Sequence, residues 1–267
     1  FRRVLFRSMP LIHLDTDPWQ IGKNYPAAAA ILGDPKATLP DITEATRARM
    51  TSGQRGLARE RFHDAKEASM AEREALKMKA RALAGNTPVA PLALLEAIGA
   101  MLPKDAVVVE EVLSSAHGAR MTINADDPQA FFAMRGGGIG WGLPAAIGVK
   151  LALPERPVVA LVGDGSAMYT VQALWTQARE GLNVTNVIFS NRAYQILRME
   201  FAGVGAGVAP GPRASAMMSI DNPVLDFAAM AKGMGVPSRR AGTCEELIAA
   251  LQGYLREPGP SLIDVIL

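Results

Sequence analysis

One short segment combines the residue types that bind a phosphate-bearing ligand through a metal ion. An apolar run at residues 158–162 leads directly into Gly163-Asp164-Gly165-Ser166. Glycines let a ligand approach the backbone closely, and the start of a following helix offers unpaired N–H groups that suit phosphate. A carboxylate at that point would repel a bare phosphate, so the segment favours a divalent cation between the two, and oxygen ligands of this kind suit Mg²⁺.

A second polar position follows the next apolar run along the chain. Residues 184–189 lead into Ser190-Asn191-Arg192-Ala193-Tyr194. If the two runs are neighbouring parallel strands joined through one helix, their ends meet at the edge of the sheet where ligands bind, and Asn191 lies beside Asp164. Gly-Asp-Gly alone is a common turn, but the longer pattern from strand to Asn191 indicates a cation site.

The elements that must position these residues alternate between strands and helices. Strands that are apolar on both faces and alternate with helices predict an α/β fold with a parallel sheet flanked by helices. The predicted strands span residues 106–109, 157–162, 184–189 and 261–266, with another near Val236. The predicted helices span residues 91–102, 114–122, 139–153, 171–180, 224–232 and 245–255.

The first third of the chain has a different composition. A short β-like run at residues 11–15 precedes the turn signal Asp17-Pro18. Residues 58–84 are rich in charged residues, Ala and Met without Gly or Pro, which predicts a long helix that ends at Gly85-Asn86-Thr87-Pro88. We therefore expect four parts: residues 1–8, a short segment 9–57, a linker helix 58–89 and the main domain 90–267.

Composition excludes several classes of protein. The 267 residues are 49% hydrophobic and 20% charged, which rules out wholesale disorder. A net charge of +2 argues against nucleic-acid binding through bulk charge. The single cysteine, Cys244, leaves no internal disulfide or cysteine cluster and fits a reducing cytoplasm. The longest weakly polar stretch, residues 136–154, carries Lys150 and several glycines, so no membrane span is expected.

Several spaced motifs resemble those of thiamine diphosphate (ThDP) enzymes. Gly163-Asp164-Gly165, 24 intervening residues and Ser190-Asn191 resemble the signature of that family, which runs from Gly-Asp-Gly to Asn-Asn. Residues 137–148, 166–169 and 173–176 are similar to the family as well. The resemblance covers residues 91–267, the diphosphate-binding domain, and is closest to acetolactate synthase large subunits and benzoylformate decarboxylases.

The N-terminal segment is similar to another part of the same family. Residues 11–15, 17–18 and 21–26 resemble the second half of the central domain, which binds FAD in some members and nothing in others. The resemblance implies the C-terminal part of a longer enzyme, without the pyrimidine-binding domain and with FAD as a candidate cofactor of the longer protein. Residues 1–8 match nothing in the family, so we expect a non-native sequence there.

The resemblance carries specific roles to positions of this chain. It implies that the side chains of Asp164 and Asn191 and the backbone carbonyl of Ala193 ligate Mg²⁺. It places the cofactor against Ser114, Gly137, Gly138, Ile139, Gly163, Gly165, Ser166, Asn191 and Tyr194. Ile139 would support the bent cofactor, whereas from the sequence alone it is a core residue of a helix.

Some positions depart from the family pattern or have open roles. Ser190 stands where Asn is usual, and Arg192 and Gln195 replace small residues, so they either crowd the diphosphate or give it donors. The pair Glu110-Glu111 follows a predicted strand and is a weaker candidate for the cofactor's surroundings. His117 is more simply read as structural or exposed.

The chemistry that the resemblance implies belongs to the cofactor. The enzyme would decarboxylate a small-molecule 2-oxo acid and release an aldehyde or pass the product to a second carbonyl; synthase and decarboxylase remain alternatives. The activating Glu belongs to a pyrimidine-binding domain on a second copy of the full-length chain, so no catalytic residue is expected here and the isolated chain should be inactive. The alternatives are a silent module that binds ThDP·Mg²⁺ or a partner, and a nicotinamide-binding domain, which the missing acidic residue after the glycines disfavours.

Overall fold

The computed structural model describes residues 9–123, 126–204 and 209–267, and the expectation for residues 1–8 lies outside them. The chain forms two compact units, and the division falls between Ser69 and Met70, within helix α2 (Ser52–Ala82). Within the described ranges, no helix has the length and apolar character needed to cross a lipid bilayer.

The first unit contains two short parallel strands and two helices. Strand β1 (Ile12–Asp15) pairs with β2 (Ala29–Leu32), and the predicted strand at residues 11–15 is thus confirmed. Helix α1 (Pro35–Arg49), which the sequence analysis missed, begins after Asp34, whose carboxylate accepts the Ala37 N–H at 2.9 Å. Helix α2 starts six residues before the predicted position. Its first turns include Gly53 and Gly56, two glycines that the predicted helix left out.

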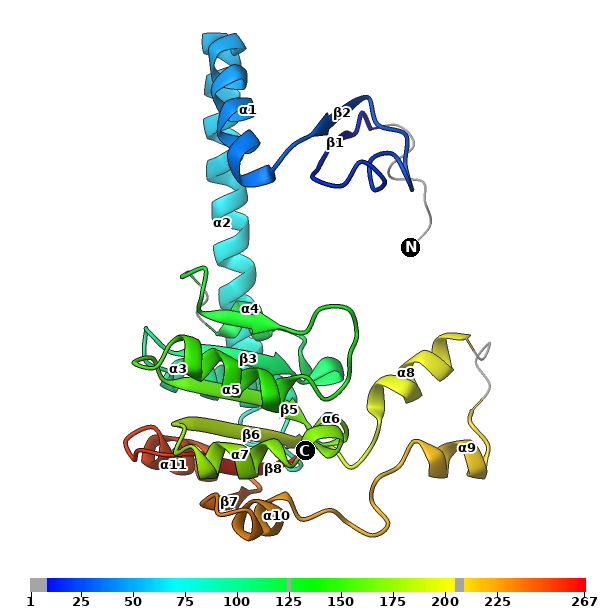
Figure 1. Cartoon of the computed structure of the whole chain (residues 1–267), viewed down its shortest axis with the longest axis vertical. Helices are drawn as coiled ribbons and strands as arrows, with labels where there is room; N and C mark the ends of the chain where they lie inside the picture. The colour runs from blue at the N-terminus through cyan, green and yellow to red at the C-terminus, as the bar shows by residue number, and fades with distance from the viewer. Residues whose placement is uncertain (1–8, 124–125, 205–208) are drawn as a thin grey trace. The chain divides into compact units, whose positions relative to one another are not determined.

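The second unit is built on a six-stranded sheet with the order β4-β3-β5-β6-β8-β7, and every paired strand is parallel (Figure 1). The predicted α/β class with a parallel sheet is confirmed. The strands are β3 (Val107–Glu111), β4 (Phe131–Ala133), β5 (Val158–Gly163), β6 (Val184–Ser190), β7 (Ser238–Ala241) and β8 (Ser261–Ile266).

Helices cover both faces of this sheet because each central strand is apolar on both sides. On β5, Val159 and Leu161 belong to one core, whereas Val158, Ala160 and Val162 belong to the other. The first core also contains residues of α3 (Pro91–Met101), α4 (Ala119–Thr122) and α11 (Cys244–Tyr254). The second contains residues of α5 (Gly142–Ala152), α6 (Asp164–Thr170), α7 (Ala173–Arg179) and α10 (Phe227–Gly233).

Three predicted boundaries are wrong in ways that matter for the site. The helix expected from Ile139 begins only at Gly142, because Gly140 has a φ of +89° that a helix cannot contain, so Ile139 lies in a loop. Residues 114–122 form the 3₁₀ turn Leu113–Ser115 and then α4, separated by Gly118 at φ +89°. The pair Glu110-Glu111 lies within β3 rather than after it.

Two further helices, α8 (Gln195–Val204) and α9 (Pro212–Met217), follow β6 and were not predicted. The helix expected at residues 171–180 is preceded by the separate short helix α6. The remaining predicted strands and helices are confirmed, with boundaries that differ by a few residues.

Candidate functional site

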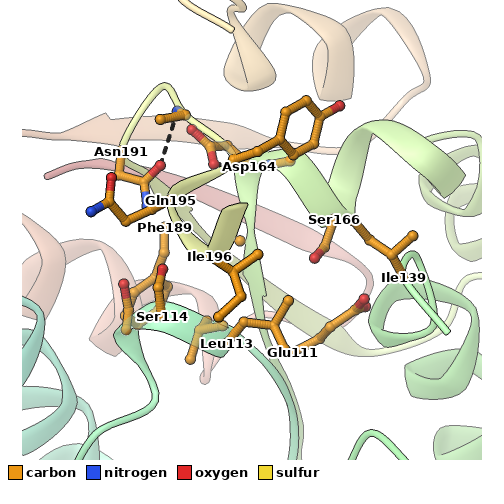
Figure 2. Close-up of a pocket in the computed structure, with 16 residues that line it drawn as sticks. Glu111, Leu113, Ser114, Ile139, Asp164, Ser166, Phe189, Asn191, Gln195 and Ile196 are labelled. Atoms are coloured by element: carbon orange, nitrogen blue, oxygen red, sulfur yellow. Dashed lines mark hydrogen bonds between the residues drawn. The ribbon is translucent and has the colours of Figure 1, made fainter. Parts of the chain in front are cut away.

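A pocket with about 370 Å³ of empty space lies where β3, β5 and β6 end (Figure 2). These three strands are adjacent in the sheet, and each contributes residues from the segment that follows it. The loop before α5 contributes one more side chain, Ile139. Nine positions that the resemblance assigned to the cofactor or metal line this pocket: Ser114, Ile139, Gly163, Asp164, Gly165, Ser166, Asn191, Ala193 and Tyr194.

Asp164 is buried at the centre of the site. One carboxylate oxygen accepts the N–H of Gly165 at 2.8 Å, and the other accepts the N–H of Arg192 at 2.5 Å. Burial raises the pKa of Asp164 to about 6, opposed by these two N–H donors and reinforced by the charge of Asp264. A bound cation would stabilise the ionised form of this carboxylate, because a nearby positive charge lowers the pKa that burial raises.

Asn191 lies beside Asp164, as the parallel arrangement of β5 and β6 predicted (Figure 2). Its side-chain oxygen accepts the N–H of Ala193 at 3.0 Å, which folds the loop after β6 back toward the pocket. Within the described ranges no three His, Cys, Asp or Glu side chains gather to hold a metal. A cation here would therefore use one carboxylate together with amide and carbonyl oxygens, a donor set that fits Mg²⁺.

Ser190, the departure from the family pattern, does not line the pocket. It is buried at the end of β6, where its hydroxyl donates to Asp264 at 2.5 Å. The other carboxylate oxygen of Asp264 accepts from Arg240 at 3.3 Å. Burial raises the pKa of Asp264, and the bonds from Ser190 and Arg240 oppose that rise. Ser190 thus anchors the strand end from which Asn191 projects.

Gly165 is required by the packing of Tyr194. A Cβ at Gly165 would lie 2.7 Å from two carbons of the Tyr194 ring, closer than any side chain tolerates. Burial raises the pKa of the Tyr194 hydroxyl, with smaller contributions from Tyr169 and Asp164. Of the two unusual residues in this loop, Gln195 lines the pocket, whereas Arg192 is not among the lining residues and contributes its backbone N–H to Asp164.

The glycine loop before α5 only partly matches expectation. Ile139 lines the pocket and is 37% exposed, but Gly137 and Gly138 are exposed and are not among the lining residues. Their contact with the cofactor stays a prediction. His117 is also exposed and outside the pocket lining.

Of the pair Glu110-Glu111, which the sequence offered as a weaker candidate, Glu111 lines the pocket, but its bonds to the glycine loop were not predicted. Glu111 is 1% exposed, lines the pocket, and accepts the N–H groups of Gly140 and Gly142 through its two carboxylate oxygens. The signal was an acidic residue at the end of an otherwise apolar strand, 29 residues before Gly140 in the glycine-rich segment.

Comparison with known proteins agrees with this geometry. The family model described as "Thiamine pyrophosphate enzyme, C-terminal TPP binding domain" matches residues 113–265. The chain belongs to this family. The match confirms the family predicted from the Gly-Asp-Gly motif. It includes all nine of the lining positions named above, from Ser114 to Tyr194.

The relatives of this chain include synthases and decarboxylases. IlvX of Mycobacterium tuberculosis, whose name assigns it provisionally to the acetolactate synthase large subunits, is 48% identical over 64% of this chain and 33% of its own length. The benzoylformate decarboxylase of Pseudomonas aeruginosa is 39% identical over 67% of this chain and 32% of its own. The chain thus spans about a third of the length of these relatives.

A solved structure supports the same fold. The ThDP-dependent 4-hydroxybenzoylformate decarboxylase of Rhodococcus jostii RHA1 superposes with a TM-score of 0.62 and 32% sequence identity. The superposition covers 68% of this chain and 33% of that one.

Proposed function

We propose that this chain binds ThDP through Mg²⁺ in the pocket at the ends of β3, β5 and β6. We further propose that it is the C-terminal part of an enzyme that decarboxylates a 2-oxo acid and either releases an aldehyde or passes the product to a second carbonyl. The observation that carries the proposal is the placement of Asp164 and Asn191 at the ends of adjacent parallel strands, both facing one pocket.

Each part of the pocket has a role in this proposal. Asp164, Asn191 and the carbonyl oxygen of Ala193 would hold Mg²⁺, which would neutralise the charge between carboxylate and diphosphate. Ser114, Gly163, Gly165 and Ser166, which surround the same space, would hold the diphosphate. Ile139 and Tyr194 would give the rest of the cofactor apolar and aromatic contacts.

The chemistry supplied by bound ThDP is an electron sink that allows a 2-oxo acid to lose carbon dioxide. The contribution of this chain is binding and orientation. Asp164 must be ionised to hold a metal, so cofactor binding near pH 6 should release a proton from that carboxylate. Leu113, Phe189 and Ile196 line the pocket with apolar atoms and exclude water around the ligand.

Other features of the proposal concern the longer protein. The names of the relatives support a 2-oxo acid substrate and leave synthase and decarboxylase as alternatives. The activating Glu would come from a domain outside this chain, on a second copy within a homo-oligomer. FAD is a candidate only for the longer protein. We assign the protein to the cytoplasm because its one cysteine, Cys244, is a buried free thiol, which fits a reducing compartment.

Calorimetric titration of the chain with ThDP, with and without Mg²⁺, tests the proposed site. We expect saturable binding that requires Mg²⁺ and is lost in Asp164→Ala. Asp41→Ala, the same substitution on the exposed surface of α1, is the matched control and should bind like the wild type. Equal binding by Asp164→Ala, or binding that ignores Mg²⁺, would contradict the proposal.

A second candidate function is a module that binds ThDP·Mg²⁺ without turnover. It is favoured by the pocket itself, because the nine positions assigned there all concern cofactor or metal binding. Turnover of a 2-oxo acid by the chain, measured alone and with an N-terminal half of a relative supplied separately, distinguishes the two. Activity that appears only with the supplied half would support the enzyme; binding without activity in either case would support the module.

A further inference from the structure

Glu111 connects the sheet to the loop that carries Ile139. It is the last residue of β3 and is 1% exposed. One of its carboxylate oxygens accepts the N–H of Gly140 at 2.7 Å, and the other accepts the N–H of Gly142. Figure 2 shows this carboxylate directed from the end of β3 toward the side of the pocket where Ile139 lies. Two N–H donors on one buried carboxylate are charge-assisted bonds, which are stronger than bonds between neutral groups.

The same loop is held from its opposite side by α6. The hydroxyl of Thr170 donates to the carbonyl oxygen of Gly140 at 2.8 Å. A Cβ at Gly140 would lie 2.6 Å from the Cβ of Tyr169, so the backbone is packed directly against this helix. Both polar groups of Gly140 are thus bonded, its N–H to Glu111 and its carbonyl to Thr170.

The packing around Gly142 leaves no room for a side chain at this position. A Cβ there would lie 2.9 Å from both Oε2 of Glu111 and Cγ2 of Val162. By contrast, a Cβ at Gly136 or Gly138 would meet nothing within 4 Å. The loop therefore has an open first half and a second half fixed at Gly140 and Gly142, and Ile139 is the residue at the boundary.

We propose that Glu111 is a positioning residue for the cofactor, which holds Gly140 and Gly142 and thereby fixes the Ile139 side chain in the pocket. This inference rests on the proposed function, because it takes ThDP as the ligand that Ile139 contacts. The neighbouring Glu110 has no such part: its carboxylate accepts the Val112 N–H at 2.8 Å, two residues along its own strand end.

The first test measures the loop without any ligand. Hydrogen–deuterium exchange is followed at the amides of Gly140 and Gly142 in the wild type, Glu111→Gln and Glu110→Gln. The two N–H groups bond to different oxygens of Glu111, and a glutamine replaces one of these oxygens with an NH₂ donor, so one of the two bonds is lost. We expect exchange at these amides to accelerate about tenfold or more in Glu111→Gln and to stay at the wild-type rate in Glu110→Gln. Unchanged exchange in Glu111→Gln would overturn the proposal.

The second test separates positioning of the cofactor from general stability. Each variant is titrated with ThDP and, separately, with inorganic pyrophosphate, both with Mg²⁺. Pyrophosphate lacks the rings that would reach Ile139, so Glu111→Gln should lose about tenfold in ThDP affinity while it binds pyrophosphate like the wild type. A purely structural role would weaken both ligands equally and would overturn the proposal.

A second variant guards against misfolding of Glu111→Gln. Thr170→Val removes the bond to the Gly140 carbonyl and should cause the same selective loss for ThDP, whereas Thr170→Ser keeps the hydroxyl and should restore it. If Glu111→Gln and Thr170→Val both bind ThDP with wild-type affinity although amide exchange in the loop is faster, the link between the loop and the cofactor is overturned. Failure of the wild type to bind ThDP or pyrophosphate would instead refute the proposed function and this role with it, while the exchange data would still decide whether Glu111 holds the loop.

Discussion

The carboxylate of Asp164 accepts the backbone N–H of Arg192 at 2.5 Å, which ties the start of α6 to the loop after β6. Arg192 has a φ of +58°, in the left-handed region that non-glycine residues rarely adopt. The turn at Arg192 aims its N–H at Asp164 and continues into Ala193, whose own N–H bonds to Asn191. The proposed metal ligands are therefore set by a backbone turn and not by side chains alone.

Substitution of Arg192 tests this turn. Arg192→Gly keeps the N–H and removes the strain at φ +58°, so the free energy of unfolding should stay equal or rise by up to about 1 kcal/mol. Arg192→Pro removes the N–H and requires a φ near −65°, so it should lower stability by about 3 kcal/mol and abolish Mg²⁺-dependent ThDP binding. Urea unfolding and calorimetry measure both. Equal behaviour of the two variants would show that the turn does not set the site.

Gly165 and Tyr194 should show compensating effects. Gly165→Ala places a Cβ 2.7 Å from the Tyr194 ring and should cost about 1–3 kcal/mol of stability and weaken ThDP binding. Tyr194→Phe keeps the ring and should not rescue the variant, whereas Tyr194→Ala should restore much of its stability. Thermal unfolding of the single and double variants measures the coupling, and additive effects would contradict a steric cause.

The pH dependence of stability should report the burial of Asp164. Its pKa of about 6 in the folded chain lies above the ordinary value of 3.8, so between these values the folded state holds a proton that the unfolded state releases. This contribution to stability is fully present below the lower value and is lost as pH rises through about 6. In the absence of Mg²⁺, the wild type should therefore lose stability relative to Asp164→Asn between about pH 4 and pH 7, by at most about 3 kcal/mol.

The test compares how the free energy of unfolding changes with pH in the two proteins. The hydrogen bonds that Asn changes shift this free energy equally at every pH, so they do not affect the comparison. Unfolding free energies of the wild type and Asp164→Asn are measured at several pH values from 4.5 to about 7.5. Asp264 is present in both proteins, so its own titration largely cancels. A constant difference between the two proteins would show that Asp164 keeps an ordinary pKa in the fold.

The pair Ser190 and Asp264 should be energetically coupled. Ser190→Ala removes a donor from a fully buried carboxylate and should cost about 1.5–3 kcal/mol. In an Asp264→Asn background the acceptor is no longer charged, so the same substitution should cost less. A double-mutant cycle from urea unfolding measures the difference. No coupling would show that Ser190 does not anchor the end of β6 through Asp264.

Much of the site could be predicted because strand ends and spaced motifs are visible in the sequence. The apolar runs before Gly163 and Ser190 indicated neighbouring buried strands, and that arrangement alone placed Asp164 beside Asn191. Packing partners distant in sequence gave no such signal. The contact between Tyr194 and Gly165, and the bond between Ser190 and Asp264, depend on how the loop and strands meet in space.

The glycine loop shows why the remaining details could not be predicted. Residues 136–148 contain glycines and small apolar residues that fit either a loop or the start of a helix. The left-handed φ of Gly140 ends that ambiguity, and it depends on tertiary contacts with Glu111 and Thr170. Similarly, the end of a predicted strand made Glu111 a candidate for the site, but its bonds to Gly140 and Gly142 depend on tertiary contacts that local sequence does not reveal.

The order of the strands has a consequence for how such a pocket can evolve. From β3 the chain passes through α4 to β4 on one side, and it returns through α5 to β5 on the other side of β3. The segments after β3 and β5 therefore leave the sheet toward opposite faces, which makes a topological switch point between two hydrogen-bonded strands. A ligand can be enclosed there without any insertion into the sheet. The residues that line the crevice can diverge in their connecting segments, so new substrate preferences can evolve while the hydrogen-bonded framework stays the same.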